Sequence, residues 1–99
     1  MGRPKAKLTV PDTVTGLVRS LHPLLKKKVR GAFQIILEDP FSGKELKDEL
    51  AGLRSLRIGR YRIIYRMPQE GQVEIVAVGS RERIYEETYR LIQKQRTER

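Results

Sequence analysis

The sequence predicts an α+β fold, in which an antiparallel β-sheet packs against an N-terminal helical hairpin and is followed by a C-terminal helix. Two early segments have apolar residues at helical spacing, three later segments are rich in β-forming residues, and a last helical segment begins near Ile84. The expected order of elements is β-α-α-β-β-β-α. With 99 residues, 38% of them hydrophobic, the chain is predicted to be a single domain over residues 1–99.

The first strand and the helical hairpin are predicted between residues 5 and 38. Residues 5–10 alternate between polar and apolar side chains, which indicates a short strand that Pro11 ends. Asp12 or Thr13 is expected to cap the first helix, whose apolar face consists of Val14, Leu17, Val18 and Leu21. A second helix is expected to begin at Pro23 and to end before Asp39 and Pro40.

The middle of the chain is predicted to form three strands. Residues 41–52 are a polar connector with an expected helical turn around 44–50. Strands are predicted at residues 53–58, 61–67 and 73–78, and Gly59 and Arg60 form a tight turn between the first two. The third strand is apolar on both faces by strict alternation, so it is expected to be central in the sheet.

The two ends of the chain are polar. The last helix is predicted from Ile84 into a frayed tail over 93–99, and residues 1–4 and 94–99 are expected to be flexible. No apolar run approaches the roughly 18 residues of a membrane span, and the N-terminus resembles no signal peptide. We therefore expect a cytoplasmic protein with no membrane partner.

The lack of metal-binding and thiol chemistry limits the possible functions. The chain has no cysteine and one histidine, His22, which excludes disulfides, a cysteine nucleophile and a multi-histidine zinc site. His22 lies at a helix junction and is expected to be a surface or turn residue. No metal and no cofactor is predicted.

The charge of the chain favours anionic partners. It has 21 Lys and Arg residues against 12 Asp and Glu residues, which gives a formal net charge of +9. Nucleic acid or the ribosome is the favoured partner, because no amphipathic terminal segment supports binding to a membrane surface. A basic protein without such a partner is the plain alternative.

Arginines are concentrated on two of the predicted strands. Between Arg54 and Arg66 the chain has five arginines and no acidic residue. Strand alternation places Arg57 and Arg62 on the face away from the helical hairpin, and Arg81 at the end of the next strand is expected to join them. Guanidinium groups on rigid strands suit phosphate binding. The alternative is a solvated basic face, with some arginines paired to Glu70, Glu74 or Glu82.

The tyrosines fall into two pairs. Tyr61 and Tyr65 alternate on one strand and are expected to be core residues. Tyr85 and Tyr89 lie four residues apart on the last helix, so one is expected to face the core while the other lies near the arginines. A tyrosine beside the arginines can stack on an unpaired RNA base.

Two segments of the chain resemble the RelE/ParE superfamily of bacterial and archaeal toxins. They are LRSLRIGRYRIIY at residues 53–65 and VAVGSRERIY at residues 76–85. The family pattern is Leu-x-Arg-Leu-Arg-(Val/Ile)-Gly-x-Tyr-Arg-(Val/Ile)-x-Tyr, followed by a strand that ends near Gly-x-Arg and a helix with a tyrosine. The resemblance covers nearly the whole chain and implies the RelE fold.

The resemblance implies a toxin of a toxin–antitoxin module. Such a toxin is a metal-independent, ribosome-dependent endoribonuclease that cleaves mRNA in the A site of the small subunit and thereby inhibits translation. The ribose 2′-OH attacks the adjacent phosphate. A cognate antitoxin neutralises the toxin, and the two are expected to form a hetero-oligomer that binds operator DNA.

The resemblance also implies site residues. By position, the catalytic residues are Arg57, Arg62, Arg81 and Tyr85. The residues expected to bind RNA are Arg54, Ser55, Arg60, Arg66, Arg83 and Tyr89.

The sequence departs from the family pattern at Ser55, where RelE-type toxins often have a second basic residue. This departure leaves the general base unassigned, because arginine stays protonated. Two alternatives therefore stay open: a ParE-like inhibitor of DNA gyrase, and a non-toxic binding protein with the RelE fold. The joint presence of Arg57, Arg62, Arg81 and Tyr85 favours the ribonuclease.

Overall fold

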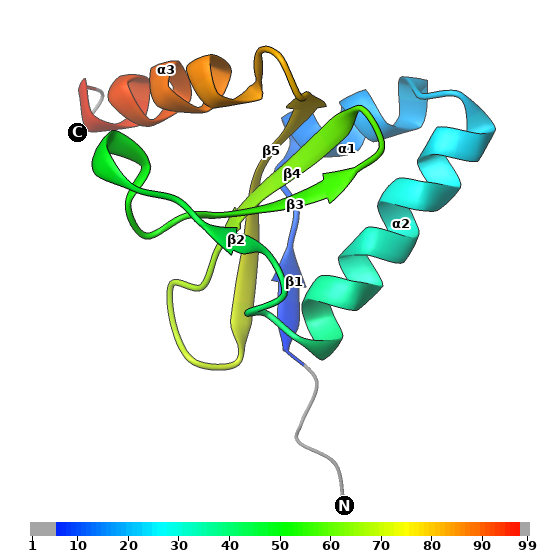
Figure 1. Cartoon of the computed structure of the whole chain (residues 1–99), viewed down its shortest axis with the longest axis horizontal. Coiled ribbons are helices and arrows are strands. Elements are labelled where there is room, and N and C mark those ends of the chain that lie inside the picture. The colour runs from blue at the N-terminus through cyan, green and yellow to red at the C-terminus, as the bar shows by residue number, and fades with distance from the viewer. Residues whose placement is uncertain (1–5, 98–99) are drawn as a thin grey trace, which may run out of the picture.

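A computed structural model describes residues 6–97 and contains three helices and a five-stranded sheet (Figure 1). The predicted α+β class is confirmed. The elements are, in order, β1 (Lys7–Thr9), α1 (Asp12–Ser20), α2 (Pro23–Glu38), β2 (Lys44–Glu45), the 3₁₀ turn η1 (Asp48–Leu50), β3 (Arg54–Ile58), β4 (Tyr61–Arg66), β5 (Gln72–Ser80) and α3 (Ile84–Thr97).

The sheet is mixed rather than fully antiparallel. Its strand order is β1-β5-β4-β3-β2, and strands β2 to β5 pair in antiparallel fashion. Strand β1 is parallel to β5, with Leu8 opposite Val73, so the prediction of an antiparallel sheet is wrong for the first strand. Alternation within a strand specifies its faces but not the direction of its neighbour, which explains the error.

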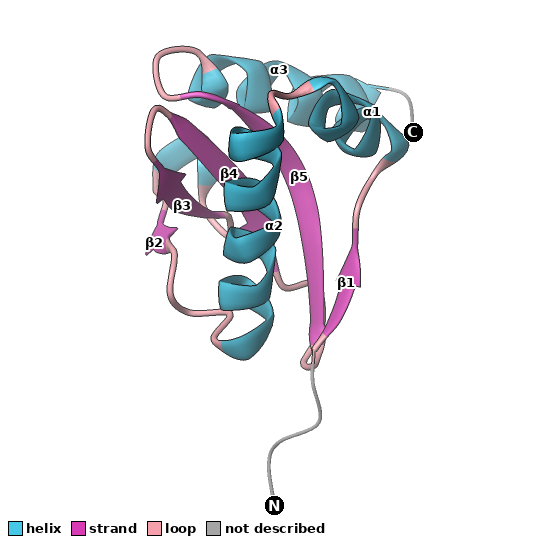
Figure 2. Cartoon of the chain, turned by 90° about the vertical axis from the view of Figure 1, so that its right-hand side faces the viewer, coloured by secondary structure: helices cyan, strands magenta, loops and turns pink. Residues whose placement is uncertain are grey.

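Helices α1 and α2 cover one face of the sheet (Figure 2). Their buried residues pack with side chains of β4 and β5, namely Val14, Val18, Val29, Ala32 and Ile36 against Ile63, Tyr65, Val73, Ile75 and Val78. His22 is the N-cap of α2, and its Nδ1 accepts a hydrogen bond from the backbone N of Leu24 at 3.2 Å. The start of α2 at Pro23 is as predicted. Asp12, in contrast, is the first residue of α1 and does not cap it, because Pro11 is the N-cap.

Helix α3 has a core of its own. Ile84 packs with Leu53, Ile64 and Val76, and Leu91 and Ile92 pack against this cluster. Helix α3 continues to Thr97, so the frayed tail predicted from residue 93 is helical as far as the described part of the chain extends. The other residues predicted to be flexible, 1–4 and 98–99, lie outside the described part of the chain, as does the expected start of β1 at Lys5. Within residues 6–97 no helix is long and apolar enough to cross a membrane.

A β-bulge changes which residues of β5 face each core. The pairing of β4 with β5 shifts between Ile64 and Tyr65. As a result Val78 lies in the core under α1 and α2, whereas Val76 and Ala77 both pack under α3. The strict alternation predicted for this strand is therefore wrong at its midpoint, because a bulge inserts one unpaired residue.

The connector after α2 is held by two side chains of the sheet. The buried Tyr65 hydroxyl donates to the carbonyl of Pro40 at 2.7 Å and accepts from the backbone N of Gly43 at 2.9 Å. Arg54 Nη1 donates to the carbonyl of Gly43 at 2.9 Å, and its guanidinium lies 5.0 Å from the centre of the Phe41 ring. The connector also adds β2 to the sheet, and the predicted helical turn is the short η1.

Replacing Gly43 by alanine is expected to lower the free energy of unfolding by about 1–3 kcal/mol, as in other overpacked sites. A Cβ at Gly43 would lie 2.6 Å from the Tyr65 hydroxyl oxygen, so the connector or Tyr65 must move. Gly31 in α2 is the matched control, because a Cβ there meets nothing within 4 Å. Gly31→Ala is expected to stabilise the protein by up to about 1 kcal/mol. Urea denaturation measures both, and equal effects of the two substitutions would contradict the prediction.

Candidate functional site

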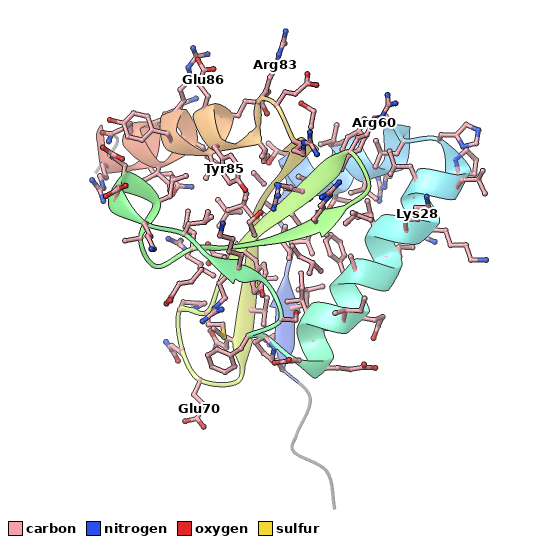
Figure 3. All side chains as sticks on the ribbon, viewed as in Figure 1. Lys28, Arg60, Glu70, Arg83, Tyr85 and Glu86 are labelled. Atoms are coloured by element: carbon pink, nitrogen blue, oxygen red, sulfur yellow. The ribbon has the colours of Figure 1, made fainter. Side chains whose placement is uncertain are left out.

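Three side chains from β3, β4 and α3 meet on the sheet face that α3 partly covers, and we call them the inner cluster: Ser55, Arg62 and Tyr85. Arg62 Nη1 donates to Ser55 Oγ at 3.2 Å, and the guanidinium carbon lies 5.8 Å from the centre of the Tyr85 ring. The Tyr85 hydroxyl oxygen is 3.3 Å from Ser55 Oγ. Figure 3 shows Tyr85 between α3 and the sheet, whereas Arg83 and Glu86 point outwards from this region.

The inner cluster is partly shielded from water, because Ser55 is buried and Arg62 and Tyr85 are half-buried. Ser55 is only 2% exposed, and Arg62 Nε is buried without a hydrogen-bond partner in the described part of the chain. Because Ser55 Oγ accepts from Arg62, its own hydrogen can point to the Tyr85 oxygen. In that arrangement the hydrogen of the Tyr85 hydroxyl is available to an incoming ligand.

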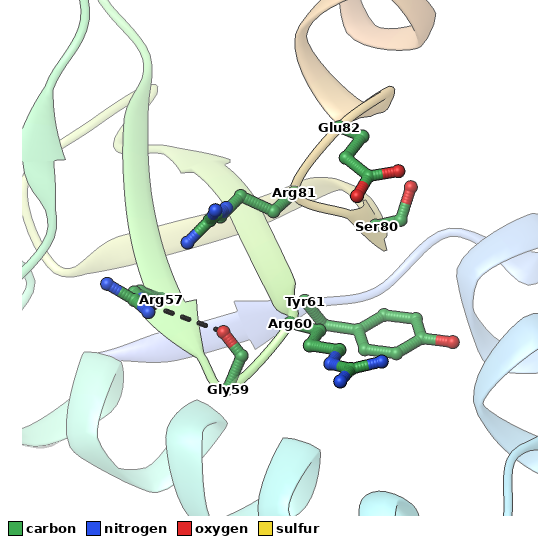
Figure 4. A pocket seen from close by; sticks show the side chains of 7 residues that line it. All are labelled: Arg57, Gly59, Arg60, Tyr61, Ser80, Arg81 and Glu82. Carbon is green, nitrogen blue, oxygen red and sulfur yellow. Dashed lines mark hydrogen bonds between the residues drawn. The ribbon is translucent and has the colours of Figure 1, made fainter.

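A hollow of about 610 Å³ lies at the end of the sheet, at the turn between β3 and β4 (Figure 4). It is lined by Arg57, Gly59, Arg60, Tyr61, Ser80, Arg81 and Glu82. The backbone N of Arg81 donates to the carbonyl of Arg60 at 2.8 Å, which ties the end of β5 to the turn. Arg57 Nε donates to the carbonyl of Gly59 at 3.3 Å. We call this cavity the hollow below.

Arg57 connects the hollow to the inner cluster. It lies directly opposite Arg62 in the β3–β4 pair, so the two side chains share the sheet face under α3. Figure 4 shows the guanidinium groups of Arg57 and Arg81 on one side of the hollow. The structure therefore brings the four predicted catalytic residues, Arg57, Arg62, Arg81 and Tyr85, to one end of the sheet.

Three of the residues predicted to bind RNA are held by the protein itself. Arg54 bonds to the connector, and Arg66 pairs with Glu74 through Nε at 2.9 Å and Nη2 at 2.6 Å. Ser55 is buried in the inner cluster. The pairing of Arg66 with Glu74 is the one that the sequence offered as the alternative to RNA binding, and RNA binding by Arg54, Ser55 and Arg66 stays a prediction.

The other residues predicted to bind RNA are exposed. Arg60 lines the hollow. Arg83 is exposed just before α3, and Tyr89 is 40% exposed on α3, where it lies outside the inner cluster. Of the two tyrosines of α3, Tyr85 is thus the one beside the arginines.

Four residues of the hollow were not among the predicted site residues, namely Gly59, Tyr61, Ser80 and Glu82. Tyr61 was expected to be a core residue, yet it is half-buried and lines the hollow, whereas Tyr65 is fully buried. The position of Tyr61 in the sequence could have indicated this. Tyr61 is the first residue after the predicted turn, where the sheet ends, and it pairs with Ser80 at the end of β5.

The chemistry of this region is that of an anion site. Guanidinium groups are permanent cations with several donors, which suits phosphate oxygens and the charge that develops on them during phosphoryl transfer. Across residues 6–97, His, Asp and Glu side chains form no group of three that could hold a metal ion.

Comparisons with known proteins identify relatives of the chain. The family model described as "ParE toxin of type II toxin-antitoxin system, parDE" matches residues 17–85. The structure of the RelBE2 toxin–antitoxin complex from Mycobacterium tuberculosis is similar at 32% identity and a TM-score of 0.69, with 78% of this chain and 92% of that chain covered. No curated protein sequence matches.

Two further solved structures share the fold. A free double arginine-to-alanine variant of the E. coli toxin RelE has a TM-score of 0.72 at 17% identity, covering 93% of this chain and 98% of that one. The RelE–RelB complex from Pyrococcus horikoshii OT3 has a TM-score of 0.65 at 19% identity, covering 81% and 99%. Since the family model spans more than half of the chain, the chain belongs to the RelE/ParE superfamily and is a toxin of a type II toxin–antitoxin system.

Proposed function

We propose that this toxin is a ribosome-dependent endoribonuclease that cleaves mRNA without a metal ion. The observation that carries the proposal is the inner cluster, in which Arg62 and Tyr85 are held together beside the exposed guanidinium groups of Arg57 and Arg81. A site of this kind provides cationic hydrogen-bond donors for a phosphate, and it places the phenol of Tyr85 close to the same phosphate.

In the proposed reaction the ribose 2′-OH attacks the adjacent phosphorus and the bond to the 5′-oxygen breaks. The products are a 2′,3′-cyclic phosphate and a new 5′-hydroxyl, so one proton leaves the 2′-oxygen and one reaches the 5′-oxygen. Negative charge grows on the non-bridging oxygens of the pentavalent intermediate, where Arg62 and Arg81 donate hydrogen bonds. The proton from the 2′-oxygen passes to solvent water. The Tyr85 hydroxyl donates its hydrogen to the leaving 5′-oxygen while Ser55 donates to the Tyr85 oxygen, and the resulting phenolate regains a proton from solvent.

We place the reaction on the ribosome because the inner cluster lacks a general base. None of Ser55, Arg62 and Tyr85 is a strong base at neutral pH, so the cluster alone is poorly equipped to remove the 2′-proton. Accurate placement of the RNA on a scaffold can supply a large part of the rate instead.

We propose in addition that an acidic antitoxin neutralises the toxin. The net charge of +9 and the exposed arginines of the hollow favour an anionic partner. Several of the structural relatives are toxin–antitoxin complexes, which supports a partner of this class.

A second candidate function is inhibition of DNA gyrase, and the family model for ParE toxins favours it. One experiment separates the two functions. The purified toxin is added to a reconstituted translation reaction and primer extension maps cleavage of the mRNA, while a parallel assay follows supercoiling by gyrase. We expect cuts in the translated mRNA and unchanged supercoiling. Intact mRNA together with inhibited supercoiling would contradict the ribonuclease and support inhibition of gyrase.

A further inference from the structure

We infer that the hollow binds one nucleotide of the RNA in two parts, with the phosphate on Arg57 and Arg81 and the base on Tyr61, Ser80 and Glu82. The base that fits has an exocyclic amino group. The inference rests on the proposed function for the view that the nucleotide belongs to a substrate RNA, but nucleotide binding can be measured without any cleavage.

The hollow extends over the end of the sheet from one face to the other. Arg57 faces the side of α3 through its pairing with Arg62, whereas Tyr61 and Ser80 pair with each other and share the opposite face. Gly59 forms the turn between them with a φ of 58°, and a Cβ there would meet nothing within 4 Å. The phosphate and the base of a nucleotide are separated by the sugar, so a nucleotide can bridge the two faces across this open turn.

The two sides of the hollow differ in chemistry. Figure 4 shows the Tyr61 ring and Arg60 on the side away from the Arg57 and Arg81 guanidinium groups. Aromatic rings and arginine side chains are the groups on which unpaired bases stack. The volume of about 610 Å³ lies within the range of about 300–1,000 Å³ that is usual for small-molecule sites.

Glu82 is the feature that a site for phosphate alone does not explain. Its carboxylate lines a cavity with three guanidinium groups, yet none of the ion pairs within residues 6–97 joins Glu82 to them. A carboxylate repels phosphate but accepts hydrogen bonds from amino groups, as it does from N4 of cytosine. Uracil has a carbonyl oxygen at the same position, which the carboxylate repels. Ser80 can serve either base.

The inference is tested by titrating the ¹⁵N-labelled toxin with cytidine 5′-monophosphate, uridine 5′-monophosphate and ribose 5-phosphate and following chemical shifts. We expect the cytidine nucleotide to bind at least about fivefold more tightly than the uridine nucleotide, with shifts at Tyr61 and Ser80. Ribose 5-phosphate is expected to bind most weakly. Equal affinities for the two nucleotides in the wild-type protein would overturn the inference.

Variants separate the two parts of the site. Tyr61→Leu, which keeps an apolar side chain but removes the ring, is expected to weaken cytidine nucleotide binding about tenfold, while Tyr61→Phe preserves the binding. Glu82→Ala is expected to abolish the preference and to raise the affinity for the uridine nucleotide, a gain that a purely structural role would not produce. Arg57→Ala should weaken all three ligands, and an unchanged preference in Glu82→Ala would overturn the assignment of Glu82.

Failure of this inference is distinguishable from failure of the proposed function, because none of the three ligands is cleaved. If the toxin inhibits gyrase, does not cleave mRNA and still prefers the cytidine nucleotide, the inferred nucleotide site stands and the proposed ribonuclease function fails. If the toxin cleaves mRNA on the ribosome but binds both nucleotides equally, the proposed function stands and the inferred nucleotide site fails.

Discussion

Arg62→Ala and Arg81→Ala are each expected to lower the rate of mRNA cleavage on the ribosome by about 10²–10³-fold. Losing one preorganised donor to a charge that develops in the transition state typically has an effect of this size. Arg62 is held on β4 by Ser55 and by the ring of Tyr85, and Arg81 is positioned by its backbone bond to the turn. Single-turnover cleavage of a programmed ribosome measures both rates.

Controls separate a lost donor from a damaged fold. The side chain of Arg81 is exposed, so its removal is expected to leave the melting temperature unchanged. Arg62→Lys tests geometry at the inner cluster, because lysine retains the charge but loses the planar fork of donors. Arg90→Ala is the matched control, because Arg90 is exposed on α3 and pairs with Glu86, so cleavage should be unaffected. Wild-type rates in both alanine variants would show that neither arginine contacts the reacting phosphate.

Local patterns in the sequence were sufficient to place the predicted catalytic residues. Strand alternation put Arg57 and Arg62 on the face away from the helical hairpin, and their direct pairing across β3 and β4 agrees with it. The turn at Gly59 set this register, since a tight turn determines which residues of a hairpin face each other. The i, i+4 spacing of Tyr85 and Tyr89 likewise limited the tyrosine near the arginines to two candidates.

Contacts between residues far apart in the chain could not be predicted in this way. The engagement of Arg54 by the connector depends on tertiary structure, and so does the burial of Ser55 beneath α3. For Arg66 the sequence named Glu74 only as one of three possible partners, and the β4–β5 register selects it. The parallel pairing of β1 has no local signature either. Tyr61 was misassigned because its strand continues the core pattern of Ile63 and Tyr65, although the core itself ends before the last residues of the sheet.

Free mRNA is expected to be cleaved at least about 10⁴-fold more slowly than the same mRNA on the ribosome. The inner cluster supplies charge stabilisation through Arg62 and a proton donor through Tyr85, but no strong base for the 2′-OH. A general base contributes about 10²–10⁴-fold, and an aligned reactant can contribute far more through orientation alone. The rate therefore depends on holding the 2′-oxygen in line with the leaving 5′-oxygen, which flexible RNA in solution rarely achieves.

The measurement uses one labelled mRNA, with and without programmed ribosomes, at equal toxin concentrations. Arg81→Ala serves as the background control, because cleavage of free RNA that is as fast in this variant as in the wild-type toxin comes from a contaminating nuclease. If lack of alignment is the cause, raising the concentration of free RNA until it saturates the toxin leaves the rate low, since binding alone does not align the 2′-oxygen. Efficient cleavage of saturating free RNA by the wild-type toxin would contradict the prediction and would require a base within the toxin itself, with Glu82 as the first residue to replace because it is the carboxylate that lines the hollow.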